Sequence, residues 1–301
     1  MKLFLAALTL LLPAAAAAQA RSGALAQPGG APKPAASVTS GFTYAAPAGL
    51  FSGRTEAGGE AAAGRAAGLD LRAALEAAHI RSATGGYFPQ ELFKTSLNLS
   101  GEDRRTRAAV TLNSNSDRPF NSASETDLGF NFTRTFSERG AHAWFAGLSY
   151  SSRRSFMRGL PMPFIGYRYV TKDLFFVFPF LIRWQALKTV ALSASYQPVK
   201  YFRTALAWTP PGPFSAELEG GAALEHFLLA GREDKSVSLY NETRFIGLKP
   251  ALLLSKQIKA CATIGWRFPG RYYTGSSYDD YRAVTRLGAG PVFGLSLSGG
   301  F

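Results

Sequence analysis

Apolar and polar residues alternate along most of this chain, from near Glu91 to its end. Residues 96–100 and 128–133, for example, carry an apolar side chain at every second position. A period of two is typical of a β-strand with one apolar and one polar face. Turn-forming residues separate these segments at short intervals, so the pattern predicts an all-β, antiparallel fold of about 12 strands, within a range of roughly 10–14.

One apolar segment breaks the simple alternation. Residues 174–184 carry apolar side chains at both odd and even positions, so both faces of this expected strand are apolar. Pro179 interrupts its backbone hydrogen bonding. Phe175, Val177 and Leu181 alternate with a second apolar set, so one of the two sets must face the interior. The other strands are expected at residues 96–100, 108–113, 128–133, 144–150, 165–169, 190–196, 202–208, 214–219, 237–255, 258–268 and 293–301.

The closing strand carries its apolar side chains at Phe293, Leu295, Leu297 and Phe301, with Gly or Ser between them. A final strand that stops on a bare aromatic suits a face that meets lipid. This ending resembles the C-terminal assembly signal of bacterial outer-membrane β-barrels, which typically finish on Phe. The resemblance implies that the barrel assembly machinery reads these residues. Gly299 departs from it, because a larger apolar residue is usual there.

The N-terminus has the pattern of a secretory signal peptide. Lys2 supplies a positive start, an apolar run covers residues 3–12, and Ala18-Gln19-Ala20 is a small-x-small cleavage site. The apolar run is too short for a transmembrane helix. Residues 1–20 are therefore predicted to be removed near Ala20 during export, which leaves a mature chain that begins near Arg21.

Residues 21–90 differ in composition from the remainder. They are rich in Ala, Gly and Pro and hold few large apolar residues, so they are expected to form a flexible leader or linker, with a folded plug as the alternative. Residues 70–80, capped by Asp70, are a candidate short helix. The expected domain order is a signal peptide at 1–20, this leader at 21–90 and an outer-membrane barrel at 91–301.

The C-terminal half also resembles a group of uncharacterised bacterial proteins that are predicted to be outer-membrane barrels. The resemblance rests on residues 161–169, on Phe178-Pro179-Phe180 and on the closing strand. It implies a fold and an outer-membrane location, and it brings no known activity with it.

Composition agrees with a barrel that crosses a membrane. The chain holds 23 Phe, 12 Tyr and 4 Trp, yet its mean hydropathy is −0.01, as expected when each lipid-facing residue is followed by a polar one that faces the lumen. The formal charge of +13 is scattered rather than gathered in a tract, so anionic lipid headgroups or solutes fit it better than nucleic acid does. Cys261 is the only cysteine, so an internal disulfide is excluded.

Motifs for catalysis, cofactors or metals are absent from the sequence. The three histidines are His79, His142 and His226, and a lone His is more often structural than catalytic. His226 follows Glu225 near an expected loop, which makes it the best placed of the three for a site. The sequence therefore predicts no cofactor, no metal site and no enzymatic activity.

One constellation of charges stands out. If the apolar residues face lipid on three successive strands, the opposite face carries both signs of charge at Glu217, Glu219, Glu242, Arg244, Lys259 and Arg267. These charges either pair and fill a narrow lumen, or line a watery path that selects solutes by their sign. A barrel of about 12 strands has a modest lumen, which favours the filled state.

The chain is thus expected to be an outer-membrane barrel that acts as a passive channel or has a structural role. Its expected partners are outer-membrane lipids, the barrel assembly machinery and, for a channel, a small solute. Two alternatives stay open. A lipid-active or proteolytic barrel enzyme needs a His within hydrogen-bond reach of a Ser, Asp or Glu. A soluble periplasmic β-protein needs protein over the apolar face of the closing strand.

Overall fold

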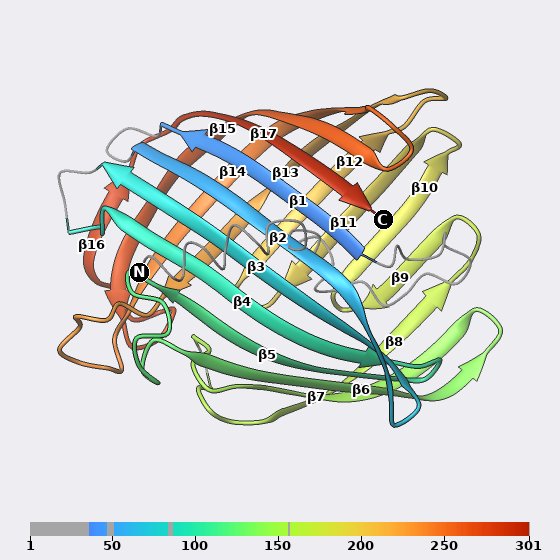
Figure 1. Ribbon diagram of the computed structural model, residues 1–301, viewed down its shortest axis with the longest axis horizontal. Helices are drawn as coiled ribbons and strands as arrows, with labels where there is room; N and C mark the ends of the chain where they lie inside the picture. Colours follow the sequence, from blue (N-terminus) through green and yellow to red (C-terminus); the bar gives the residue numbers. More distant parts are fainter. Residues whose placement is uncertain (1–35, 47–50, 84–86, 156, 301) are drawn as a thin grey trace.

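The alternating segments form one antiparallel β-sheet that closes on itself (Figure 1). The computed structural model describes residues 36–46, 51–83, 87–155 and 157–300. The expected signal peptide at 1–20 and the terminal Phe301 lie outside these residues. No helix of the described residues is long and apolar enough to cross a membrane.

Seventeen strand segments make up the sheet. The first nine are β1 (Ala36–Ala45), β2 (Phe51–Ala66), β3 (Leu69–Ala83), β4 (Glu91–Glu102), β5 (Thr106–Ser116), β6 (Asp127–Arg139), β7 (His142–Ser151), β8 (Met162–Val170) and β9 (Leu174–Phe178). The others are β10 (Leu181–Leu187), β11 (Val190–Gln197), β12 (Tyr201–Trp208), β13 (Phe214–Phe227), β14 (Ser238–Leu253), β15 (Ile258–Gly275), β16 (Arg282–Leu287) and β17 (Gly290–Gly300).

The barrel closes through β1, which pairs with β2 on one side and with β17 on the other (Figure 1). Strands β16 and β17 both pair with β15, along successive stretches of it, and therefore share one position in the wall. The wall thus has sixteen strand positions rather than about twelve. One extra position arises because residues 174–184 form two strands, β9 and β10, which turn at Pro179 and Phe180.

The other three extra positions come from the region expected to be a leader. Residues 36–83 hold β1, β2 and β3, so the barrel includes this region and does not start at Glu91. Residues 70–80 lie within β3 and are extended rather than helical. Their Ala-rich sequence has high intrinsic helix propensity, but β3 pairs along its length with β2 and β4, and this tertiary pairing overrides the local preference.

The strand register places the apolar side chains on the outer face. Leu206, Leu218, Leu248 and Ile264 lie directly opposite one another on β12 to β15, and Ile264 lies opposite Phe293 on β17. All five are exposed although they are large and apolar. A closed sheet satisfies its own backbone hydrogen bonds, and such an outer row can therefore lie in hydrocarbon.

The two ends of the barrel differ in their connections. One end carries Ala36 and Gly300 together with short turns, such as Ala67-Gly68, whose residues both have positive φ and form a tight hairpin. The opposite end carries longer loops, including residues 117–126, 152–161 and 228–237. By the usual rule for such barrels, the short turns face the periplasm. We call these the inner and the outer end.

The height of the wall is uneven. Strands β2, β3, β14 and β15 have 16, 15, 16 and 18 residues. Strands β9 to β12 have only 5, 7, 8 and 8 residues, and short connections at 179–180 and 198–200 join them at the outer end. One side of the barrel is therefore tall and the opposite side low.

Candidate functional site

Inward-facing charges on β12, β13 and β14 form a compact ion-pair group. Glu219 accepts contacts from Arg203 at 2.5 Å and from Lys249 at 2.6 Å, and Arg203 also donates to Glu217 at 2.7 Å. The side chain of Glu219 is only 7% exposed, whereas those of Arg203 and Lys249 are about one-third exposed. The structure therefore places Glu217 and Glu219 in the lumen and joins each of them to a cation.

A second group lies nearer the outer end. Glu225 on β13 accepts hydrogen bonds from Arg54 on β2 at 3.3 Å, from Lys94 on β4 at 3.0 Å and from the Asn241 amide at 3.4 Å. Strands β2 and β4 are not neighbours of β13, so these contacts cross the lumen. Arg54 and Lys94 were missed in the sequence, because Arg54 lies in the supposed leader and Lys94 just before the first expected strand.

Two further members of the predicted cluster face the lumen from β15. Lys259 lies opposite Ser298 and Arg267 opposite Gly290, on the inward side of the sheet. Arg267 lines a cavity of about 240 Å³ together with Glu219, Lys249 and other residues. The structure gives neither Lys259 nor Arg267 an ion pair within the described ranges, so the six predicted residues do not make one network.

Glu242 and Arg244 lie on the outer face of the barrel instead. The pairing of β13 with β14 runs without a bulge, so Arg244 shares the face of Ile246 and Leu248. For Glu242 and Arg244 to face the lumen, the strand would need a bulge near Pro250, and no such bulge forms in its pairing with β13. Glu242 and Arg244 contact each other at 3.1 Å, and Glu242 contacts Arg271 at 2.7 Å.

Apolar side chains fill part of the interior. Toward the outer end, inward residues of β3, β4 and β13 to β16 join the loop residue Phe88 in a buried cluster, which comprises Ile80, Phe88, Leu92, Phe227, Leu239, Tyr272 and Leu287. A smaller cluster on the low side contains Phe145, Phe175 and Val177, with Leu181 packed against it. The ambiguous set of Phe175, Val177 and Leu181 is therefore the inward one.

The outer end of β13 crosses the mouth of the barrel to reach β5. Strands β6 to β12 separate these two on one side, and β14 round to β4 separate them on the other, so they face each other across the lumen. Leu228 N donates to Asn115 O at 2.7 Å, and the Asn115 amide donates to His226 O at 3.4 Å. Strand β6 pairs with β5 only as far as Asn113, which leaves the end of β5 free for this contact.

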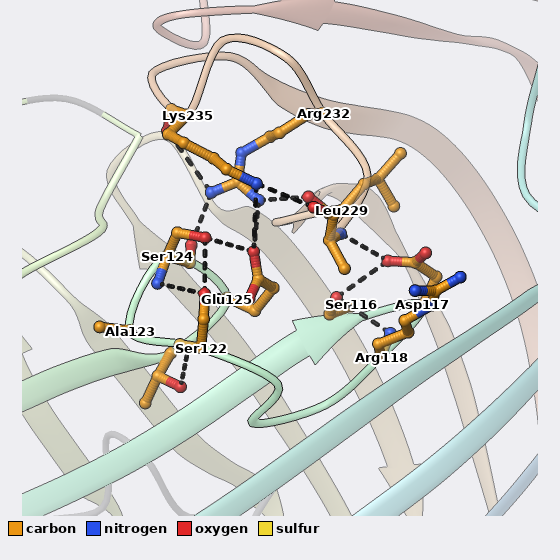
Figure 2. A network of polar contacts seen from close by, with 12 residues as sticks. Ser116, Asp117, Arg118, Ser122, Ala123, Ser124, Glu125, Leu229, Arg232 and Lys235 are labelled. Carbon is orange, nitrogen blue, oxygen red and sulfur yellow. Dashed lines mark hydrogen bonds and ion pairs between the residues drawn. The ribbon is translucent and has the colours of Figure 1, made fainter.

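Loops 117–126 and 228–237 contact each other next to this crossing through hydrogen bonds and an ion pair. We call the two loops together the outer latch. Figure 2 shows Arg232 between Glu125 and Leu229. Arg232 contacts the Glu125 carboxylate at 3.4 Å and donates to the backbone oxygens of Ser124, at 2.5 Å, and Leu229. On the other side of the latch, Ala230 N donates to the Asp117 carboxylate at 2.7 Å. Both Glu125 and Arg232 are almost fully buried.

The ionisation of Glu125 couples the latch to pH. Burial alone would raise its pKa, but hydrogen bonds from Ser122 and Ser124 and the charges of Arg232 and Lys235 outweigh burial, so the pKa lies below the ordinary value of 4.5. A lowered folded-state pKa gives stability that is present above the unfolded value and is lost as the pH falls through the folded value.

We therefore expect the latch to stay closed from about pH 7 to about pH 5 and to loosen only below that range. Conductance of the refolded protein in a planar bilayer, measured across this interval, would report the loosening. Glu125→Gln, which cannot titrate, should abolish the acid response. An unchanged acid response in that variant would show that another group controls the mouth.

Among the residues that the structure describes, the three histidines have few polar partners. Nε2 of His79 and Nε2 of His226 have no hydrogen-bond partner, and Nδ1 of His142 lies 2.5 Å from the Tyr167 hydroxyl. His79 approaches Glu91 only to 3.8 Å. In the part of the chain that the structure describes, no group of three or more His, Cys, Asp or Glu side chains could hold a metal ion.

Comparisons with family models and with curated proteins found no match. An outer-membrane channel from Pseudomonas putida F1 is similar at 9% identity and a TM-score of 0.38, over 92% of this chain and 100% of that one. OmpT of Vibrio cholerae is similar at 9% identity and a TM-score of 0.32, over 88% of this chain and 96% of that one. The outer membrane protease OmpT from Escherichia coli is similar at 9% identity and a TM-score of 0.19, over 88% of this chain and 96% of that one. These similarities do not decide between transport and catalysis.

The barrel itself carries the evidence on location. On the closing strand, Phe293, Leu295 and Leu297 point outward, and Leu295 is 70% exposed, so no other part of the described chain covers this face as a soluble protein would require. A closed sheet with an apolar outer face and charges inside has the properties that a lipid bilayer demands. The chain is therefore a β-barrel protein of the bacterial outer membrane.

Proposed function

We propose that the protein is a passive channel for small solutes, not an enzyme, and that the outer latch closes its mouth in the present structure. A wall of sixteen strands is in the size class that leaves an aqueous lumen, unlike the narrower barrel expected from sequence. The crossing of β13 onto β5 is the observation that carries the proposal, because it closes the one end at which long loops can move.

The nature of this closure favours a gate over a permanent plug. Within the described ranges, it consists of one backbone hydrogen bond, from Leu228 N to Asn115 O, and the side-chain contacts of two loops, rather than a continuous ladder between walls. The latch can therefore part without unfolding either wall. On the low side, the inward residues of β11 and β12 are mostly small, including Ala191, Ser193, Ser195, Ala205 and Ala207. A solute path along these small residues would pass the ion pairs of Arg203 rather than a continuous row of large side chains.

A cross-link across the latch tests the proposal. Asp117→Cys and Ala230→Cys, in a Cys261→Ser background, place two thiols where Ala230 N now meets the Asp117 carboxylate. We expect the reduced, refolded chain from Arg21 to give discrete conductance steps in a planar bilayer. Oxidation should suppress these steps, and a reductant should restore them.

Each single-cysteine variant serves as the control for oxidation, and slower gel migration after boiling reports folding. A purely structural barrel would stay silent in both redox states, which would reject the channel. An enzyme would instead hydrolyse a phospholipid or peptide substrate and lose that activity when His226 is replaced. The unpartnered His226 Nε2 and the hydroxyl partner of His142 support the non-catalytic proposal.

A further inference from the structure

Strand β15 exchanges its inner and outer faces at a bulge. Arg244 lies opposite Phe268, but Glu242 lies opposite Arg271, so the register shifts by one residue between them. Arg267, on the inner-end side of the bulge, faces the lumen. Without the bulge Arg271 would share that face, but the shift turns it to the outside of the barrel, beside Glu242.

Three guanidinium groups gather on this outer surface. Arg271 lies directly opposite Arg286 on β16, and Arg244 follows on β14. The next residue after Arg286, Leu287, is buried in the interior cluster, so Arg286 itself points outward. Glu242 is the carboxylate that contacts this group, at 2.7 Å from Arg271 and 3.1 Å from Arg244. We call Arg244, Arg271 and Arg286 the outer arginine group.

The arrangement leaves positive charge uncompensated. Like charges directly opposite on neighbouring strands destabilise a sheet, yet Arg271 and Arg286 occupy such a pair. Arg286 is exposed and has no ion pair to any residue of the described ranges. The nearby Asp280 is already bonded to Arg282, at 2.8 Å. One carboxylate therefore faces three guanidinium groups, and an anion between Arg271 and Arg286 would relieve their repulsion.

The position of the outer arginine group relative to the apolar band of the barrel indicates which kind of molecule would supply such an anion. Outward residues of β15 from Ile258 to Phe268 form the band on this side. Ten steps of ~3.3 Å along a strand tilted by ~40° rise about 25 Å, which is the usual height of the apolar band of such barrels. Arg271 follows immediately beyond Phe268, at the level of the outer-leaflet headgroups.

We propose that the outer arginine group binds the phosphate of a lipid headgroup in the outer leaflet. Guanidinium groups bind phosphate oxygens in pairs and hold them more firmly than single charges do. Trp266 and Phe268, exposed just below on β15, provide an apolar surface for the acyl chains of the same lipid. The bound lipid stabilises the register that the bulge creates.

Native mass spectrometry of the refolded protein in detergent tests this site. The probes are lipid A with its two phosphates, the same lipid after enzymatic dephosphorylation, and inorganic phosphate. We expect the phosphorylated lipid to bind at least ~10-fold more tightly than the dephosphorylated one, which corresponds to ~1.4 kcal/mol. Arg244→Ala with Arg286→Ala should remove this preference. Arg65→Ala, an exposed residue at the inner end of β2, should leave it intact.

A thermal measurement makes the test independent of lipid retention. In lipid-free detergent, Arg286→Ala should raise the unfolding temperature, because it removes the repulsion with Arg271. In the unaltered protein, phosphorylated lipid A should raise it instead. Equal binding of the two lipids, or a double variant that binds like the unaltered protein, would overturn the proposal. So would displacement of the lipid by inorganic phosphate at equal concentration, because this would reveal a site for free anions.

Discussion

Arg232→Ala should open the outer mouth and increase the open probability of the channel by roughly 10-fold or more. The Arg232 side chain is 7% exposed and joins the Glu125 carboxylate to the backbone of both latch loops. A hydrogen bond to a charged group is worth about 1.5–3 kcal/mol, and each 1.4 kcal/mol shifts a two-state equilibrium about tenfold. Planar-bilayer recordings of the refolded variant would measure the change.

Arg118→Ala is the matched control for this experiment. Arg118 lies in the same loop as Glu125, but its side chain is exposed, and its hydrogen bonds use the backbone: its N–H donates to the Ser116 hydroxyl and its oxygen accepts from Asn121 N. It should behave like the unaltered protein, and Arg232→Lys should recover part of the closure, because a lysine keeps the charge but loses the forked geometry. If Arg232→Ala folds fully and its conductance does not change, the latch is not the gate.

Glu219→Ala should destabilise the barrel by about 2–3 kcal/mol. The substitution leaves Arg203 and Lys249 without the carboxylate that now lies 2.5 Å and 2.6 Å from them. Breaking a fully buried pair costs about 3–5 kcal/mol, and the partial exposure of both cations reduces this figure. Reversible unfolding by guanidinium in lipid vesicles, followed by tryptophan fluorescence, would give the free energy of unfolding.

Glu217→Ala supplies the comparison, since Glu217 lies two residues away on the same face. Its loss leaves Arg203 paired with Glu219 and should cost less than about 1 kcal/mol. Lys249→Met combined with Glu219→Ala should recover part of the lost stability, because it also removes the Lys249 charge that Glu219→Ala leaves without its carboxylate. If Glu219→Ala and Glu217→Ala lowered the free energy of unfolding equally, Glu219 would not be the centre of the ion-pair group on β12, β13 and β14.

Strands with large apolar residues on one face were predictable from sequence, and strands with small residues were not. The all-β, antiparallel character followed from segments such as residues 128–133. The segment Leu69–Ala83 was misjudged because Ala and Leu favour a helix where no partner strand is known. A signal was nevertheless present in the preceding segment, where Arg54, Glu56 and Glu60 recur at even positions. Alternation of charge, not only of hydrophobicity, marks a strand that lines a lumen.

The candidate site was predictable only on strands where the expected alternation of inward and outward residues held. On β13, every second residue faces inward, and Glu217 and Glu219 lie where the alternation puts them. On β14, no bulge near Pro250 interrupts the pairing with β13, so Glu242 and Arg244 lie on the outer surface. Contacts such as Glu225 with Lys94 join strands on opposite sides of the barrel. Local patterns hold no information about such pairs, because barrel closure alone brings them together.

The low side of the barrel has a consequence for the membrane around it. A strand of seven residues, such as β10, spans six steps and rises only about 15 Å along the membrane normal at the usual tilt, against about 25–30 Å of hydrocarbon. Such hydrophobic mismatch is relieved by thinning of the bilayer or by tilting of the whole molecule, at a cost of fractions of a kcal/mol per Å. The tall strands on the other side oppose a large tilt. Lipids next to β9–β12 must therefore be compressed, and this flank is where the outer membrane is thinnest and most easily deformed.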